Sequence, residues 1–265
     1  MTHPDLINPV QSLTLGLGRD AAATTAKTLV GEVQIGCLLE DVIAKASQTG
    51  LIDDILVAGQ SVMCSDLSAD IKMFDPTAYC EGHRGLGIPF NKTQKVTIKA
   101  TLDANGTFVA AVNVQNLPAE VRNAGIPDVN SLGPRLHYLF GLGKKVVPAA
   151  APSTAIITAT ASRDVRLGLL SMSAADATIL DLTVQSIKHN NKEFLTGRND
   201  STIDEVPLAT FDFRNTDVDG RILAADVKTN DKLTMTLKNF NVGDLTVWGG
   251  IFCMPVDDAP GEAGE

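Results

Sequence analysis

Asparagine and aspartate recur at alternate positions in the stretch that begins at Asn215. The twelve residues from Asn215 to Asp226 carry side-chain oxygens at the first, third, fifth and twelfth positions, and glycine at the sixth. Ca²⁺ takes about six to eight oxygen ligands, and a tight turn at glycine delivers alternate side chains to one centre. The spacing therefore predicts a calcium site with these ligands: Asn215, Asp217, Asp219, Asp226 and the Arg221 carbonyl.

Two departures from the usual calcium loop keep a second interpretation open. Asn215 stands where such loops have aspartate, and Asp226 is shorter than the glutamate that normally binds the ion through both oxygens. The preceding Leu208–Phe213 is typical of a strand, whereas such a loop normally follows a helix. The alternative is an Asx-rich loop between strands, whose side chains bond the nearby backbone. The sequence suggests no cofactor other than calcium.

The remaining motifs favour no catalytic chemistry. Gly16–Ala21 has the spacing of a dinucleotide-binding turn, but the surrounding chain lacks the strand–helix alternation that such a site needs, so a structural turn is favoured. Adjacent carboxylates occur at Glu40–Asp41, Asp53–Asp54 and Asp204–Glu205. Neighbouring residues point apart on a strand or a helix, so none of these pairs forms a shared acid–base site. We therefore expect that the protein is not an enzyme.

The charge distribution argues against direct binding of nucleic acid. The chain has 22 Lys and Arg against 31 Asp and Glu, a net charge of −9, and no basic run. An N-terminal arm at 1–12 has no Lys or Arg to neutralise phosphates. The stretch 256–265 is acidic and rich in Gly, Ala and Pro, which predicts a flexible tail. The N-terminus lacks the layout of a secretion signal, so we expect synthesis in a cytoplasm.

The chain repeats one pair of strands. Lys95–Pro118 and Lys232–Pro255 align without a gap at an offset of 137 residues (232 − 95). In both stretches apolar residues alternate with Lys and Thr, a period of two that places the apolar side chains on one face of a strand. Each run reaches a turn that contains glycine, at Gly106 and Gly243, and continues in a second β-rich run. This is the pattern of a β-hairpin.

Further matching blocks occur in the same order along the chain. Gly16–Arg19 resembles Gly141–Lys144, Val33–Leu38 resembles Val165–Leu170, and Gln60–Val62 resembles Gln185–Ile187. Their offsets differ from that of the hairpins, so the implied insertions lie between strands, where loops absorb them. The repeat therefore indicates two tandem domains of similar fold.

We expect an all-β chain made of two tandem sandwiches. The predicted parts are a first β-sandwich at 13–118, a linker with short helices at 119–152 and a second β-sandwich at 153–255. The helix-like patches of the linker are 119–124 and 135–140, and residues 40–47 have a helical alternative. Strands are predicted near 28–38, 55–63, 69–74, 95–102 and 107–115, and near 154–161, 164–172, 178–188, 206–213, 232–239 and 245–254.

The paired hairpins Lys95–Pro118 and Lys232–Pro255, with the ordered repeat, resemble the double jelly-roll major capsid proteins of tailless icosahedral viruses. That lineage includes membrane-containing bacteriophages and adenovirus, and the resemblance spans about residues 13–255 in architecture. It implies two jelly-roll-like β-sandwiches in each chain, and trimers with a pseudo-hexameric outline as capsomers. It also implies a virion component that binds copies of itself and other virion proteins, above an internal membrane in the membrane-containing members.

The alternative function is that of a tandem carbohydrate-binding or adhesive β-sandwich protein, in which calcium loops are also common. Sugar-binding surfaces rely on exposed aromatic side chains. This chain has only Trp248, with Tyr79 and Tyr138, among its larger polar aromatics. The absence of a secretion signal also disfavours this alternative.

Overall fold

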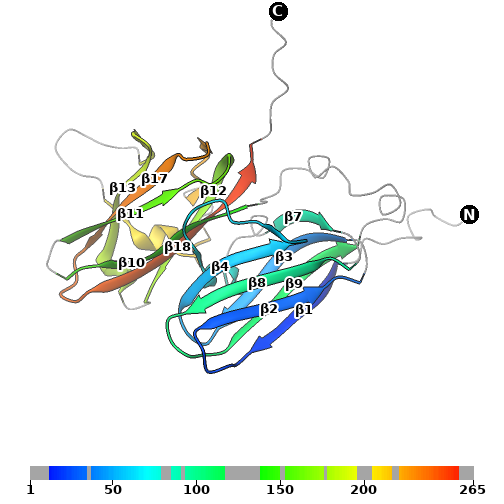
Figure 1. The fold of residues 1–265 in the computed structure, drawn as a ribbon. Coiled ribbons are helices and arrows are strands. Elements are labelled where there is room, and N and C mark those ends of the chain that lie inside the picture. Colours follow the sequence, from blue (N-terminus) through cyan, green and yellow to red (C-terminus); the bar gives the residue numbers. More distant parts are fainter. Residues whose placement is uncertain are drawn as a thin grey trace, which may run out of the picture.

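The computed structural model describes residues 12–34, 37–78, 85–90, 93–116, 138–149, 153–175, 178–195, 205–216 and 221–256. These residues form two β-sandwiches that lie next to each other, and single turns of 3₁₀ helix stand between some of the strands (Figure 1). Within the described ranges, no helix has the length and apolar character needed to cross a membrane.

Sandwich 1 consists of two antiparallel sheets. The first sheet has the order β1-β9-β3-β7 and the second the order β2-β8-β4-β5, with β6 also paired to β4. The strands are β1 (Ser12–Asp20), β2 (Ala26–Glu32), β3 (Cys37–Ala46), β4 (Gly50–Val57), β5 (Gln60–Ser61), β6 (Ala69–Asp70), β7 (Gly85–Phe90), β8 (Lys95–Leu102) and β9 (Phe108–Asn116).

Sandwich 2 repeats this plan strand for strand. One sheet has the order β10-β18-β12-β16 and the other β11-β17-β13-β14, with β15 also paired to β13. The strands are β10 (Tyr138–Val147), β11 (Ser153–Thr160), β12 (Val165–Ala174), β13 (Leu182–His189), β14 (Lys192–Glu193), β15 (Val206–Pro207), β16 (Asp226–Val227), β17 (Lys232–Asn239) and β18 (Leu245–Pro255).

The strand order is that of a jelly roll in both sandwiches. The chain crosses from one sheet to the other between β1, β2, β3 and β4, and again between β7, β8 and β9, so that the last strand pairs with the first. Sandwich 2 does the same from β10 to β18. This is the two-sheet, Greek-key arrangement of jelly rolls. The prediction of an all-β chain with two tandem jelly-roll-like sandwiches is confirmed.

Alternation of apolar and polar residues explains why the hairpin strands form a half-buried sheet. In β8, Val96, Ile98 and Leu102 point into the core, while Lys95 and Lys99 face solvent. The strand β17 has the same pattern, and both strands have the predicted bounds. Their apolar faces pack between the two sheets of their own sandwich, which buries the core of each domain.

The two sandwiches share details that a chance resemblance would not produce. A β-bulge interrupts β4 next to Asp53, and another interrupts β13 next to Gln185, at equivalent positions of the pairing with β8 and β17. Single turns of 3₁₀ helix follow β6 and β15, at η2 (Ile71–Phe74) and η5 (Leu208–Phe211), 137 residues apart (208 − 71). The same local chemistry therefore builds both domains.

Several predicted elements differ from the structure. The linker predicted at 119–152 is wrong at its end, because β10 occupies 138–147 and makes sandwich 2 begin before residue 153. The helix-like patch at 135–140 is strand in its described part, and the helical alternative at 40–47 is also strand, within β3. In both cases pairing with a neighbouring strand overrides a weak local pattern.

Other differences concern turns and alignment. The turn predicted at Gly16–Ala21 is instead mostly a bulged part of β1, and the matching block Gly141–Lys144 is a bulged part of β10. Half of the predicted strand 206–213 is a turn of 3₁₀ helix, η5, and only its first two residues form a strand, β15. A short turn η4 (Ile179–Asp181) precedes β13. The match of Gln60–Val62 to Gln185–Ile187 is wrong, because β5 is the counterpart of β14 and not of β13.

Some predictions lie outside the described residues. These are the helical patch at 119–124, the tail from 257 onward and the N-terminal arm up to residue 11. Residue 12, the last of the predicted arm, is the first residue of β1.

Candidate assembly interface

One segment of sandwich 1 lies along a sheet of sandwich 2. This bridging segment, Val62–Met73, runs from the end of β5 through β6 into η2. In space it lies alongside β10. Met63 forms a parallel bridge with Leu139, and the Cys64 amide donates to the Leu139 carbonyl at 2.9 Å. Farther along, the Gly143 amide donates to the Ser68 carbonyl at 2.8 Å. The two sandwiches are therefore joined by backbone hydrogen bonds as well as by side chains.

Glycines in β10 and β18 allow this close approach. A Cβ atom on Gly141 would lie 2.0 Å from the Leu67 carbonyl oxygen, and one on Gly250 would lie 2.6 Å from the sulfur of Met73. Glycine inside a strand weakens it unless another part of the chain has to come close. Here the bridging segment occupies the space that side chains would otherwise fill.

A serine hydroxyl and an aspartate fix the segment further. The Ser65 hydroxyl accepts from the Gly141 amide at 2.7 Å and lies 3.0 Å from the carbonyl oxygen of the same residue. Asp66 and Thr160 form two hydrogen bonds. The Asp66 amide donates to the Thr160 carbonyl at 3.0 Å, and the Thr160 amide donates to Asp66 Oδ1 at 2.7 Å. These contacts satisfy backbone groups at the joint that would otherwise be costly to bury.

Apolar side chains close the joint. Phe74 of η2 packs edge-on against Phe252 of β18, with ring centroids 5.7 Å apart. Leu139, Leu169 and Phe252 of sandwich 2 are fully buried and belong to the same apolar cluster as the core of sandwich 1. In return, Cys64 of the bridging segment is buried in the core of sandwich 2. The two domains thus share apolar surface, which stabilises one fixed arrangement.

A buried carboxyl lies at the centre of the joint. Asp70 accepts from the Lys72 amide at 3.0 Å and from the Ser173 hydroxyl of β12. Its side chain is almost completely buried. Burial is the main cause that raises the pKa of Asp70 to about 6, with a further increase from the charge of Asp212, against the lowering by its hydrogen bonds and by Lys72.

An ion pair marks the rim of the joint. Lys144 Nζ of β10 lies 2.6 Å from Asp103 Oδ1, in the turn between β8 and β9. The same ammonium lies 5.7 Å from the centre of the Trp248 ring. Both charged side chains remain partly exposed, so the pair contributes mainly to orientation rather than to stability.

Contact with sandwich 1 buries part of the outward face of β10 and β18, although Lys144 and Val146 on that face stay exposed. The equivalent face of sandwich 1 stays open. In β18 every residue from Val247 to Cys253 is buried, although neighbours in a strand point to opposite faces. In the equivalent strand β9, Val109 is exposed and Ala111 and Asn113 are half-buried. We name the outward side of β10 and β18 the covered face and the equivalent side of β1 and β9 the open face.

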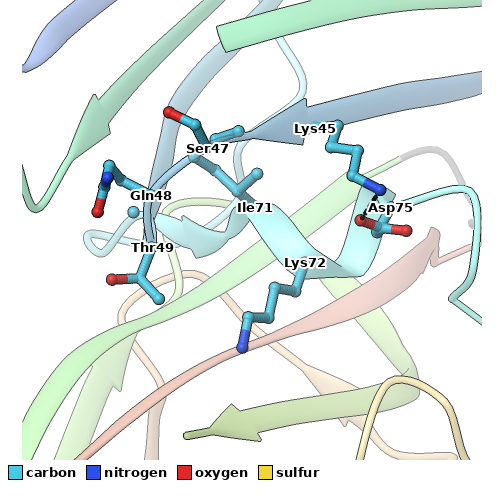
Figure 2. A pocket seen from close by; sticks show the side chains of 9 residues that line it. Lys45, Ser47, Gln48, Thr49, Ile71, Lys72 and Asp75 are labelled. Atoms are coloured by element: carbon cyan, nitrogen blue, oxygen red, sulfur yellow. Dashed lines mark ion pairs between the residues drawn. The ribbon is translucent and has the colours of Figure 1, made fainter. Parts of the chain in front are cut away.

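A pocket of about 360 Å³ opens at the end of sandwich 1 beside the joint (Figure 2). Lys45, Thr49, Lys72 and Asp75 are among the side chains that line it, and Lys45 pairs with Asp75 at 3.8 Å. The Lys45 side chain is mostly exposed, so this pair is weak. In the described part of the chain, no group of three or more His, Cys, Asp or Glu residues could hold a metal ion.

The residues predicted to bind calcium are only partly described. The Asn215 side-chain amide donates to the Thr210 carbonyl at 2.7 Å, and Asp226 forms a two-point ion pair with Arg166, at 2.6 and 3.0 Å. The Arg221 side chain is fully buried, and its guanidinium donates to the carbonyls of Leu170 and Asn215.

Asp217 and Asp219 lie outside the described residues, so the calcium site stays a prediction. Asp226, the last residue of the predicted loop, begins β16 and is held on β12 by its pair with Arg166. Calcium binding as predicted would therefore bring the ion next to this ion pair.

The bridging segment was not recognised in the sequence, although two signals for it are present. Ile71, Phe74 and Asp75 recur as Leu208, Phe211 and Asp212 at the offset of the hairpins. Gly249 and Gly250 interrupt the apolar run of a strand. Two consecutive glycines inside a strand pattern indicate that another backbone comes close.

No protein-family model and no curated protein matches this chain. Among solved structures, it is similar to VP54 of PBCV-1, fitted into a reconstruction of the virophage Sputnik, at 10% identity and a TM-score of 0.37, over 94% of this chain and 95% of that one. It is similar to the major capsid protein P2 of bacteriophage PM2, at 9% identity and a TM-score of 0.35, over 94% and 99%. It is also similar to a chain of the PBCV-1 virus capsid, at 7% identity and a TM-score of 0.40, over 96% and 97%.

Proposed function

We propose that this chain is a structural major capsid protein whose trimers form pseudo-hexameric capsomers of an icosahedral virion. This is the function that the resemblance in the sequence implies. The solved structures reported above come from virus capsids, and the same role in this chain rests on its own geometry.

The observation that carries the proposal is the head-to-tail contact between the two jelly rolls. Sandwich 1 uses its bridging segment to cover part of one face of sandwich 2, while the equivalent face of sandwich 1 stays open. Two similar domains that meet through different surfaces leave one free copy of each surface. Such a heterologous contact can repeat from chain to chain, and it closes a ring when the rotation between neighbouring domains returns to the starting point. A ring of three chains would contain six jelly rolls and would occupy a hexagonal position in a lattice.

The native mass of the purified protein tests this proposal. We expect a species of about 84 kDa, three times the chain mass of 28.0 kDa, by light scattering at micromolar concentration. A mass of one chain at every concentration, and in particles alike, would contradict the proposal.

Further parts of the proposal concern the surroundings of the protein. We expect synthesis in the host cytoplasm, incorporation into the virion and contact with other virion proteins, above an internal membrane if the virus belongs to the membrane-containing members. A calcium ion at Asn215–Asp226 is part of the same proposal. Fractionation of purified virions, followed by mass spectrometry of the capsid and metal analysis, tests these points.

A further inference from the structure

The ion pair between Asp103 and Lys144 at the rim of the joint indicates where two chains would meet. Asp103 lies at the end of sandwich 1, in the turn after β8, and its carboxylate reaches Lys144 on the covered face of sandwich 2. Every copy of this chain makes this contact internally. If the ring closes, the equivalent end of sandwich 2 reaches the open face of the next copy.

The register of the strands identifies the two equivalent positions. Asp103 follows β8 directly, and Phe240 follows β17 at the same offset of 137 (240 − 103). The Asp103 amide donates to the Thr49 carbonyl, as the Phe240 amide donates to the Asp181 carbonyl.

The partner position follows from the strand pairing. Lys144 pairs with Trp248, and Gly16 pairs with Ala111, which is the counterpart of Trp248 (248 − 137). The pair Asp103–Lys144 within a chain therefore corresponds to Phe240–Gly16 between chains.

Phe240 and Gly16 would match through apolar contact, whereas Asp103 and Lys144 match through opposite charges. Phe240 is 45% exposed, and two other large apolar side chains at the same end, Leu180 and Val242, are 78% and 92% exposed. The Lys238 ammonium lies 4.6 Å from the centre of the Phe240 ring. Exposed apolar residues gathered at one end of a domain indicate a contact with another protein surface.

The open face has room for such a ring. Gly16 is exposed, and a Cβ atom placed on it would meet no heavy atom within 4 Å. Next to it, Ala111 is small and Val109 exposes an apolar side chain. An aromatic ring can lie flat on this surface, which the lysine at the equivalent position of sandwich 2 would not allow.

We propose that Phe240, with Leu180 and Val242, docks on Gly16 of sandwich 1 in a second copy of this chain. This inference rests on the proposed function and names the surfaces that close the ring. In this inference, apolar packing and not an ion pair holds the chains together.

The test compares the concentration at which trimers dissociate for four variants, by analytical ultracentrifugation. Phe240→Asp removes the ring and should weaken assembly about tenfold or more, because burial of an aromatic side chain is lost. Gly16→Lys should weaken assembly similarly by occupying the space. The double variant should recover most of the loss, because it builds between chains the ion pair that Asp103 and Lys144 form within one. Val30→Asp, a matched change of an exposed side chain on β2, should leave assembly unchanged.

The outcomes separate this inference from the proposed function. If wild-type trimers form and Phe240→Asp dissociates no more readily than Val30→Asp, the docking is refuted and the capsomer stands. If the double variant is weaker than both single variants, Phe240 and Gly16 do not face each other, and the docking is likewise refuted. If the wild-type chain never assembles, the proposed function is refuted, and so is this inference, which rests on it. Melting curves check that each single variant still folds, as expected for exposed positions.

Discussion

Replacement of Asp70 by asparagine should stabilise the folded chain at neutral pH and change it less in mild acid. Asp70 is buried in the joint between the sandwiches, and burial raises its pKa from the ordinary value of 3.8 to about 6. The folded state therefore binds more protons than the unfolded state between these two pH values. Stability from this group falls as pH rises through that range, the reverse of the usual behaviour of aspartate.

The size of the effect follows from the two pKa values. Ionisation of Asp70 costs the folded state about 3 kcal/mol at about pH 7.5, and about 1 kcal/mol at about pH 4.5, where the group is mostly protonated when folded. Asparagine keeps an oxygen that accepts from the Lys72 amide, and its amide group can donate to the Ser173 oxygen. The advantage of Asp70→Asn over the wild type should thus grow by about 2 kcal/mol between these pH values.

Urea unfolding of both proteins across this pH range measures the effect. The difference between variant and wild type is the useful quantity, because other carboxylates contribute equally to both. An advantage of Asp70→Asn that does not change with pH would refute the reasoning, since it would mean that Asp70 titrates alike in the folded and unfolded chain. Loss of folding in the variant would show instead that the hydrogen bonds of Asp70 need a carboxylate.

Three further predictions concern other parts of the chain. Gly141→Ala should destabilise the joint by about 1–3 kcal/mol in urea unfolding, whereas Gly16→Ala, in open space, should be neutral; equal effects would contradict the close approach of the bridging segment. If calcium binds, excess ion at about a hundred times Kd should add about 2.7 kcal/mol, which chelator and Asp217→Ala should both remove; identical melting curves with and without chelator would favour an Asx-rich loop. Asp231→Asn should destabilise the chain at neutral pH and matter less in acid, because hydrogen bonds from the Asn190 side chain, the Lys228 amide and His189 lower the pKa of Asp231; a loss that is larger in acid would reverse this assignment.

The first strands of the two repeated hairpins were predictable because one face of each is buried and the other faces solvent. Lys95–Leu102 and Lys232–Asn239 have this period of two, and both strands have the predicted bounds. The strand β10 was not predictable in the same way. Residues 138–147 include Gly141 and Gly143 and lack an alternating pattern, because both faces of this strand are partly buried. Pairing with β18 along the whole strand, and not local propensity, selects the strand there.

The joint itself was visible in the sequence only as indirect signs. The consecutive Gly249 and Gly250 indicated a close approach, but no pattern in the sequence states which segment comes close. The bridging segment is mostly irregular, and its place depends on hydrogen bonds to residues more than 70 positions away, such as those between the Ser65 hydroxyl and the backbone of Gly141. The bulge at Gly16 was likewise mistaken for a turn, since both structures favour glycine.

The central claim is that the head-to-tail contact of two jelly rolls continues between chains and closes a ring. Electron microscopy of the purified protein, with class averages viewed down the ring axis, tests it most directly. We predict averages with six similar densities in a hexagonal outline and threefold symmetry, because sandwiches 1 and 2 alternate. Averages that contain only isolated pairs of sandwiches, at concentrations where the protein is stable, would contradict the claim.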